Sequence, residues 1–247
     1  MRMADPGSDI LKLPDHHVVE TERLRLRTIY VSDAEVIMSI LSSEEVMRWT
    51  SSGHPITSLT QAERWLKDRA LGSDVSNFAI ELRSEHDTDH DRRSTIGIIG
   101  SFHWPRIGYI IHPGTTGNVS CALLDCSNEA STDHTGKGYA SEALRALMPA
   151  LFERMPSASK GGLGFDHIEA LTASQNWASR KVLQKCGFTY CEIHFQDFEN
   201  PVLGLCDTTV YKIARPGTTL EELGLLPQRF TNEEVDVVDQ ELVPPIQ

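Results

Sequence analysis

The residues best suited to chemistry in this chain surround two glycines, Gly136 and Gly138. They lie in a segment from Thr135 to Ala140 that runs directly into a helix-forming sequence. Glycine removes the Cβ that keeps an anion away from the backbone, and it permits turns that aim successive N–H groups at one point. The first turn of the next helix adds unpaired N–H donors and the positive end of its dipole. The segment therefore predicts a phosphate-binding loop.

A second candidate segment is an amphipathic helix that begins at Asn176 and ends near Gly187. Asparagine is among the best N-cap residues, so capping alone explains its presence at this position. Ser179 lies one turn further along the same face. Lys185 in the last turn and the glycine just beyond it mark the end of the helix.

Two side chains have the chemistry for proton transfer. His112 is a candidate base, acting directly or through water, because the unperturbed pKa of histidine as a residue type lies near neutral pH. A lone histidine before a proline is more often a surface residue. Ser141, in the first turn of the helix after the glycines, can donate a hydrogen bond to a phosphate or act nearer the reacting atoms. The alternative is that its hydroxyl satisfies its own backbone.

Strand and helix periods alternate along the chain in a way that predicts one α+β domain. Capping boxes that begin at Ser32 and at Ser58 predict two early helices. A longer helix is expected from about residue 140 to 155. Strands are expected at 23–27, 78–82, 95–102, 107–112, 168–172, 188–195 and 208–213. We expect an N-terminal arm at 1–15, the domain at 16–215 with an insertion at 114–133, and an acidic tail at 216–247.

Composition excludes several classes of function. The net charge is −12, and residues 216–247 supply seven acids and one base, or −6 of it. An acidic chain argues against a nucleic-acid partner and suits a cationic substrate. No apolar run approaches the ~20 residues that span a bilayer, so no membrane partner is expected. The five cysteines form no close pair, which predicts neither a zinc site nor any other metal site. The N-terminal residues lack the apolar core of a signal peptide, which predicts a cytosolic or nuclear protein, and a cytoplasmic location is the expectation.

Several further segments give the sequence a family resemblance. Together with the glycine loop and the Asn176 helix, they resemble the GCN5-related N-acetyltransferase (GNAT) superfamily, most closely its ribosomal-protein-alanine acetyltransferase branch. The segments that carry the resemblance are Glu20-Thr21-Glu22-Arg23-Leu24-Arg25-Leu26-Arg27, Glu45-Val46-Met47-Arg48-Trp49, Ile96-Gly97-Ile98-Ile99-Gly100 and Ile107-Gly108-Tyr109-Ile110.

The resemblance implies a GNAT fold, in which a mixed central sheet is splayed at the cofactor site and has helices on both faces. It implies acetyl-CoA as co-substrate, with the acyl arm bound by the main chain of Tyr109, Ile110 and Ile111. The pyrophosphate would lie on Thr135, Gly136, Lys137, Gly138, Tyr139 and Ala140, with Ser141, Asn176 and Ser179 beside the arm. Catalytic roles would fall to Ser141, His112 and Asn176.

The sequence departs from the family pattern at two places. Many family members have a tyrosine seven residues after the helix-initiating asparagine, and this chain has Leu183 there. The insertion at 114–133 separates the strand ending at His112 from the glycine loop. An N-acetyltransferase acting on a protein or peptide N-terminus is the leading hypothesis. A small amine such as a polyamine or drug is the alternative acceptor, and a non-catalytic acyl-CoA sensor is a different class; the chain is expected to be a monomer or a homodimer.

Overall fold

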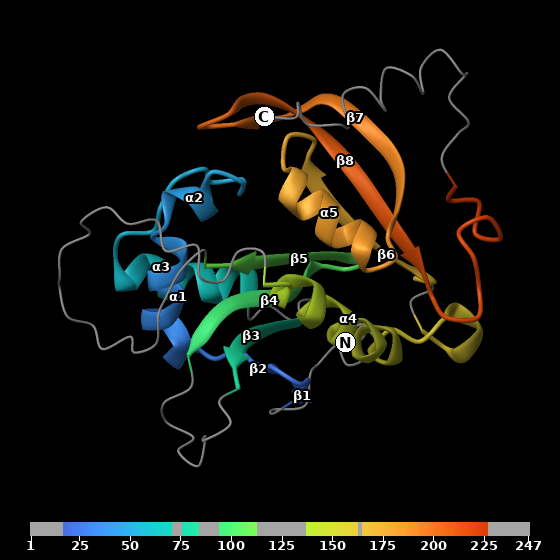
Figure 1. The fold of residues 1–247 in the computed structure, drawn as a ribbon, viewed down its shortest axis with the longest axis horizontal. Coiled ribbons are helices and arrows are strands. Elements are labelled where there is room, and N and C mark those ends of the chain that lie inside the picture. The colour runs from blue at the N-terminus through green and yellow to red at the C-terminus, as the bar shows by residue number, and fades with distance from the viewer. Residues whose placement is uncertain (1–16, 71–75, 84–93, 113–136, 163–164, 227–247) are drawn as a thin grey trace, which may run out of the picture.

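Residues 17–70, 76–83, 94–112, 137–162 and 165–226 are described by the structure, a computed structural model (Figure 1). The expected arm at 1–15, the insertion at 114–133 and the first two residues of the glycine loop, Thr135 and Gly136, lie outside these ranges.

The described part of the chain is built on one eight-stranded sheet in the order β1-β2-β3-β4-β5-β6-β8-β7. Neighbouring strands are antiparallel except β5 and β6, which are parallel. The sheet is therefore mixed, and the expected α+β class is confirmed. The strands are β1 (Val18–Glu20), β2 (Leu24–Thr28), β3 (Ser76–Leu82), β4 (Thr95–His103), β5 (Arg106–Ile111), β6 (His167–Ala173), β7 (Thr189–Asn200) and β8 (Gly204–Ala214).

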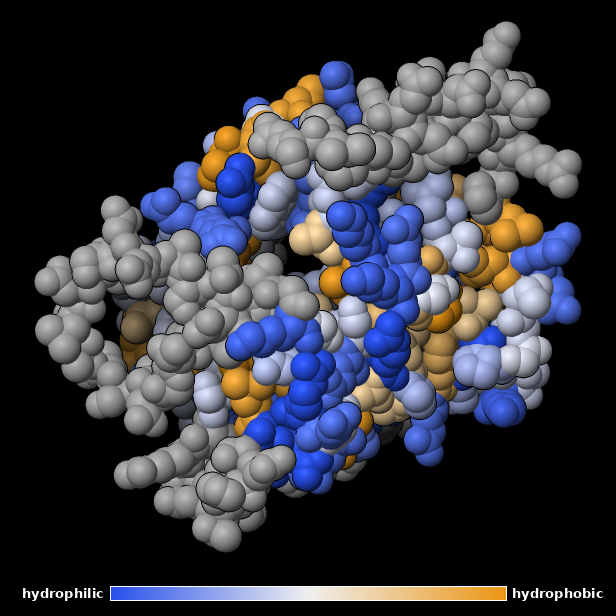
Figure 2. All heavy atoms as spheres, in the orientation of Figure 1, coloured by the Kyte–Doolittle hydropathy of each residue, from blue (hydrophilic) through white to orange (hydrophobic). Residues whose placement is uncertain are grey.

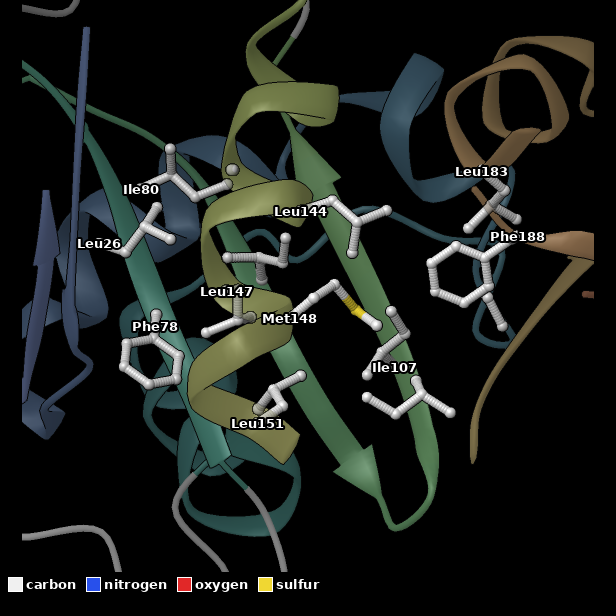
Figure 3. Packing of buried hydrophobic residues seen from close by; sticks show 14 of the residues in the cluster. Leu26, Phe78, Ile80, Ile107, Leu144, Leu147, Met148, Leu151, Leu183 and Phe188 are labelled. Atoms are coloured by element: carbon white, nitrogen blue, oxygen red, sulfur yellow. The ribbon is translucent and has the colours of Figure 1, made fainter. Parts of the chain in front are cut away.

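Helices cover both faces of this sheet (Figure 1). They are α1 (Ala34–Leu41), α2 (Glu44–Met47), α3 (Leu59–Trp65), α4 (Tyr139–Arg154) and α5 (Trp177–Lys185). The α4 helix crosses β2 to β5 and packs Leu144, Leu147 and Leu151 against them (Figure 3). A second apolar cluster joins α1 and α3 to Ile98 on the other face. The alternating strand pattern thus divides the core into two layers.

The first helix begins differently from the prediction. The expected capping box at Ser32 is wrong, because a short 3-10 turn, Val31–Asp33, precedes α1 and Tyr30 is its N-cap. The Asp33 carboxylate accepts a hydrogen bond from the Tyr30 N–H at 2.7 Å and also pairs with the Arg27 guanidinium. A charged carboxylate accepts a stronger hydrogen bond than a neutral hydroxyl does, so Asp33, and not Ser32, stabilises this helix start. The second prediction is confirmed, since the Ser58 hydroxyl caps α3.

Strands β5 and β6 separate soon after they meet. They pair only at Arg106–Glu169 and Ile107–Ala170, although β5 continues to Ile111 and β6 to Ala173. Helix α5 lies where the two strands diverge (Figure 1). The expected splay of the sheet is therefore confirmed, and it leaves the far half of β5 without a strand partner on that side among the described residues.

The chain beyond β8 begins with contacts to the domain. Arg215 pairs with Asp166 at 3.0 Å and donates to the Phe152 carbonyl at 2.5 Å. Leu220 is 8% exposed, so the first described turn of the acidic tail packs on the fold. The boundary at residue 215 stays a prediction.

Candidate active site

A cleft of about 650 Å³ opens where β5 and β6 diverge. Figure 2 shows a hollow between the side chains over α5 and those around α2. The cleft gathers most of the predicted site: Tyr109, Ile110, Ile111, His112, Gly138, Tyr139, Ala140, Ser141, Asn176 and Ser179 all line it. Lys137 is exposed just before this wall, and Thr135 and Gly136 fall outside the described residues.

The start of α4 forms one end of the cleft. Gly138 is its N-cap with φ of 82°, a left-handed conformation that favours glycine. The first hydrogen bond in this helix runs from the Glu142 N–H to the Gly138 carbonyl at 3.0 Å. The N–H groups of Ala140 and Ser141 precede that bond and point out of the helix end. Together with the helix dipole they suit a phosphate.

Arg23, the residue just before β2, holds this helix start in place. Its guanidinium pairs with the Glu142 carboxylate at 2.6 Å and donates to the Lys137 carbonyl at 3.0 Å. The same group lies 4.7 Å from the centre of the Tyr139 ring. Thr21 adds a hydrogen bond of 2.6 Å to Glu142. Burial raises the pKa of Glu142, but the bonds from Thr21 and Arg23 outweigh it and hold the pKa below its usual range.

Sequence reasoning did not assign Arg23 to the site. Strict alternation at 23–27 indicated only a strand, and nothing in that pattern shows that its first side chain reaches a helix more than a hundred residues away. The helix dipole by itself favours an acid in the first turn of α4, so the sequence does not mark Glu142 as a partner of Arg23. A tertiary ion pair of this kind leaves no local sequence signal.

Tyr109 contributes its side chain as well as its main chain. Its hydroxyl lies 3.0 Å from the Ser179 Oγ, in the first turn of α5. Burial raises the pKa of Tyr109 to about 12, and the hydrogen bond with Ser179 opposes that rise. Leu183, which replaces the family tyrosine, is 1% exposed in the core. The Tyr109 hydroxyl of β5 thus contacts α5 at Ser179, four residues before Leu183.

Asn176 is the N-cap of α5. Its Oδ1 accepts a hydrogen bond from the Ser179 N–H at 3.1 Å, so the capping interpretation is correct for this oxygen. Asn176 also lines the cleft, and its amide nitrogen is not used by the cap. A binding role for Asn176 therefore rests on that nitrogen.

His112 and Ser141 lie on the cleft wall, one at the end of β5 and the other in α4. The His112 main chain donates to the Ile96 carbonyl at 2.9 Å, which fixes the end of the strand. Ser141 is 6% exposed, and its carbonyl accepts a hydrogen bond from the Cys186 thiol at 3.5 Å. Both predicted residues thus belong to one cavity.

The far end of the cleft is formed by α2 and the turn after it, with Glu45, Val46, Trp49 and Thr50. The tip of the β7–β8 hairpin fixes this wall. The Asn200 amide donates to the Arg48 carbonyl at 3.0 Å and to the Thr50 carbonyl at 3.1 Å. Glu45 is the only carboxylate among the described residues that line the cleft.

The described residues contain no group of three or more His, Cys, Asp or Glu side chains that could hold a metal ion. Among their helices, none is long and apolar enough to cross a membrane.

Comparison with known proteins gives the same class as the fold and the cleft. The family model described as "Acetyltransferase (GNAT) domain" matches residues 23–189, more than half of the chain. The chain is 29% identical over 210 residues to the uncharacterized N-acetyltransferase YoaA of Bacillus subtilis, covering 81% of this chain and 97% of the relative.

Solved structures share the fold at low identity. RimL, the ribosomal L7/L12 alpha-N-protein acetyltransferase in complex with coenzyme A, superposes with a TM-score of 0.61 at 15% identity, covering 82% of this chain and 100% of that chain. Spermidine N-acetyltransferase from Vibrio cholerae, in complex with CoA and spermine, superposes with a TM-score of 0.57 at 15% identity, covering 79% of this chain and 97% of that chain. The chain belongs to the GNAT acetyltransferase family and is an acetyl-CoA-dependent transferase.

Proposed function

We propose that this protein transfers the acetyl group of acetyl-CoA to the N-terminal amine of a protein or peptide. The observation that carries the proposal is the charge of the cleft. Its phosphate end has the α4 helix start, and the lysines of the lining, Lys181 and Lys185, both lie on α5. The far end has the single acid Glu45 beside Val46 and Trp49. An anionic cofactor and a cationic acceptor are thus favoured at opposite ends.

The cofactor end fits acetyl-CoA. The pyrophosphate binds the N–H groups of Ala140 and Ser141 at the helix start opened by Gly138. The acyl arm then follows the half of β5 that has parted from β6, from Tyr109 to Ile111, where main-chain groups lack a strand partner on that side among the described residues. The same backbone donors can stabilise the oxygen of the thioester as it becomes negative.

The acceptor end favours a singly charged amine with an apolar neighbour. A polyamine carries several positive charges, and one carboxylate among the described lining residues offers a counterion to one of them. A peptide N-terminus places one ammonium beside a first side chain, which can pack on Val46 and Trp49. RimL acts on such an N-terminus according to its description, and the fold is shared with it.

The reaction forms one C–N bond and breaks one C–S bond. The bound ammonium first loses one proton to solvent water. The neutral amine then attacks the thioester carbonyl, and the second proton, released after the attack, passes to His112 directly or through water. The carbonyl re-forms as the thiolate leaves. With a pKa of about 12, Tyr109 keeps its proton. Its O–H donates to the Ser179 carbonyl at 3.3 Å in the structure, and it turns from that acceptor to the departing sulfur as the thiolate forms. A free thiol has a pKa near 8.5, so the thiolate then takes its proton from water.

Release of free CoA thiol from acetyl-CoA tests the proposal. The assay compares a peptide with a free N-terminal amine, the same peptide with that amine blocked, and spermidine. The free peptide is expected to stimulate release and the blocked peptide is not. Stimulation by spermidine alone would favour the small-amine acceptor, and binding of acetyl-CoA without release for any amine would favour the sensor.

A further inference from the structure

A second depression of about 630 Å³ lies beside the start of α4, on the side away from the splayed strands. It shares Gly138, Ser141 and Lys185 with the main cleft, so the two cavities are continuous around the helix start. A ligand with its pyrophosphate at Gly138 can therefore extend into either of them. One direction leads along β5, and the other leads into this depression.

The depression has three basic side chains, Arg23, Arg145 and Lys185, and two acidic ones, Glu22 and Glu142. The pairing of Arg23 with Glu142 neutralises both of those groups. Arg145 and Lys185 then face the exposed Glu22, which leaves the depression net positive. The positive charge lies next to the predicted pyrophosphate site, although the whole chain carries −12.

Arg145 connects the two helices that form this depression. Its guanidinium extends from α4 and donates to the Lys185 carbonyl at the end of α5, at 2.7 Å. This bond uses one N–H group of Arg145. It holds the planar Arg145 guanidinium beside Lys185, whose side chain carries the neighbouring ammonium. None of the other hydrogen bonds or ion pairs among the described residues engages Arg145. An arginine fork of this kind suits bidentate contact with phosphate, and a nearby lysine adds a point charge.

We propose that this depression binds the terminal phosphate monoester of CoA, the 3′-phosphate on its ribose, through Arg145 and Lys185. The inference rests on the proposed binding of acetyl-CoA at Gly138 and adds a subsite to it. A monoester phosphate carries nearly two negative charges at neutral pH, more than the single charge of each pyrophosphate unit. The subsite therefore distinguishes CoA from 3′-dephospho-CoA, which is otherwise the same molecule.

Calorimetric titration of CoA and of 3′-dephospho-CoA tests the subsite. The wild-type protein is expected to bind CoA about tenfold more tightly, as a charge-assisted contact predicts. Arg145→Gln, which keeps an amide donor for the Lys185 carbonyl, should lose most of that preference and keep its affinity for 3′-dephospho-CoA within about twofold. Arg145→Lys should recover part of the preference. Arg64→Gln, an exposed arginine on α3 that lines neither cavity, is the matched control.

Equal affinity of the wild-type protein for the two ligands would overturn the subsite and leave the proposed function standing. An equal loss of affinity for CoA and for 3′-dephospho-CoA in Arg145→Gln, with an unchanged melting temperature, would also overturn the subsite. A wild-type protein that binds neither ligand would contradict the proposed function itself, and the subsite with it.

Discussion

Arg23, just before β2, and Glu142, in the first turn of α4, form an ion pair of 2.6 Å. The pair is partly exposed, with 43% of the arginine and 19% of the glutamate side chain accessible. Pairs of this exposure contribute about 0–1 kcal/mol to stability. Its larger consequence is positional, because the same guanidinium also binds the Lys137 carbonyl and so fixes the chain just before Gly138.

We therefore predict that Arg23→Ala raises the KM for acetyl-CoA about three- to tenfold and lowers the unfolding free energy by less than about 1 kcal/mol. Arg23→Lys should fall between wild type and alanine, since it keeps the charge and loses the fork. Steady-state kinetics with thermal melts separate the two effects. An unchanged KM would show that the helix start needs no support from β2.

The same pair predicts an acid dependence of stability. The pKa of Glu142 is held below its usual range in the folded state, by hydrogen bonds that outweigh burial. Such a carboxylate stabilises the fold above its unfolded pKa, and this contribution is lost as pH falls through the folded pKa. Glu142→Gln should thus be less stable than wild type at pH 7 and equal to it in acid. A difference in unfolding free energy between wild type and Glu142→Gln that stays constant with pH would contradict this account.

Gly138 has φ of 82°, and Gly161 provides a matched control with φ of 81° and no atom within 4 Å of the place where a Cβ would lie. Alanine at either position costs about 1–2 kcal/mol of backbone strain. Gly138→Ala should in addition weaken acetyl-CoA binding at least about tenfold, because the helix start must shift to relieve the strain. Gly161→Ala should lose stability alone. Equal cofactor affinity in the two variants would remove Gly138 from the site.

The Tyr109 hydroxyl is predicted to act in the chemical step. Tyr109→Phe should lower kcat by about 10- to 100-fold, the worth of a hydrogen bond to a charged group, and leave the affinity for acetyl-CoA unchanged. Tyr190→Phe is the control, because Tyr190 lines neither cavity. With a pKa of about 12, Tyr109 should cause no break in the rate profile below pH 10. A Tyr109→Phe enzyme with wild-type kcat would exclude this role.

Much of the fold was predictable because its signals are local. Strand alternation, the Ser58 cap and the glycine after α5 each act within a few residues, and the structure confirms them. The Ser32 cap was wrong because Asp33 binds Arg27, a contact between two elements. The cleft lining was predictable where it follows the family motif. Glu45 was noted as part of a motif, but its place opposite the cofactor end depends on how the Asn200 hairpin tip fixes α2.

The tail is predicted to be separable from the transferase beyond Leu226. Leu220 is buried, so truncation after residue 217 should lower the melting temperature by a few degrees, about the effect of 1 kcal/mol on a domain of this size. Truncation after residue 226 should keep stability, acetyl-CoA affinity and turnover. Loss of acetyl-CoA binding in the longer of these two truncated proteins would place part of the acidic tail in the active site.

The central claim is transfer of an acetyl group to a peptide amine in the cleft between α2 and β5. Mass measurement of a peptide after incubation with the enzyme and acetyl-CoA tests it most directly. We predict one added acetyl group, at the N-terminal amine, and a raised KM for the peptide with unchanged acetyl-CoA affinity in Glu45→Gln. A peptide that stays unmodified while acetyl-CoA is bound, or acetylation that Glu45→Gln leaves untouched, would contradict the account.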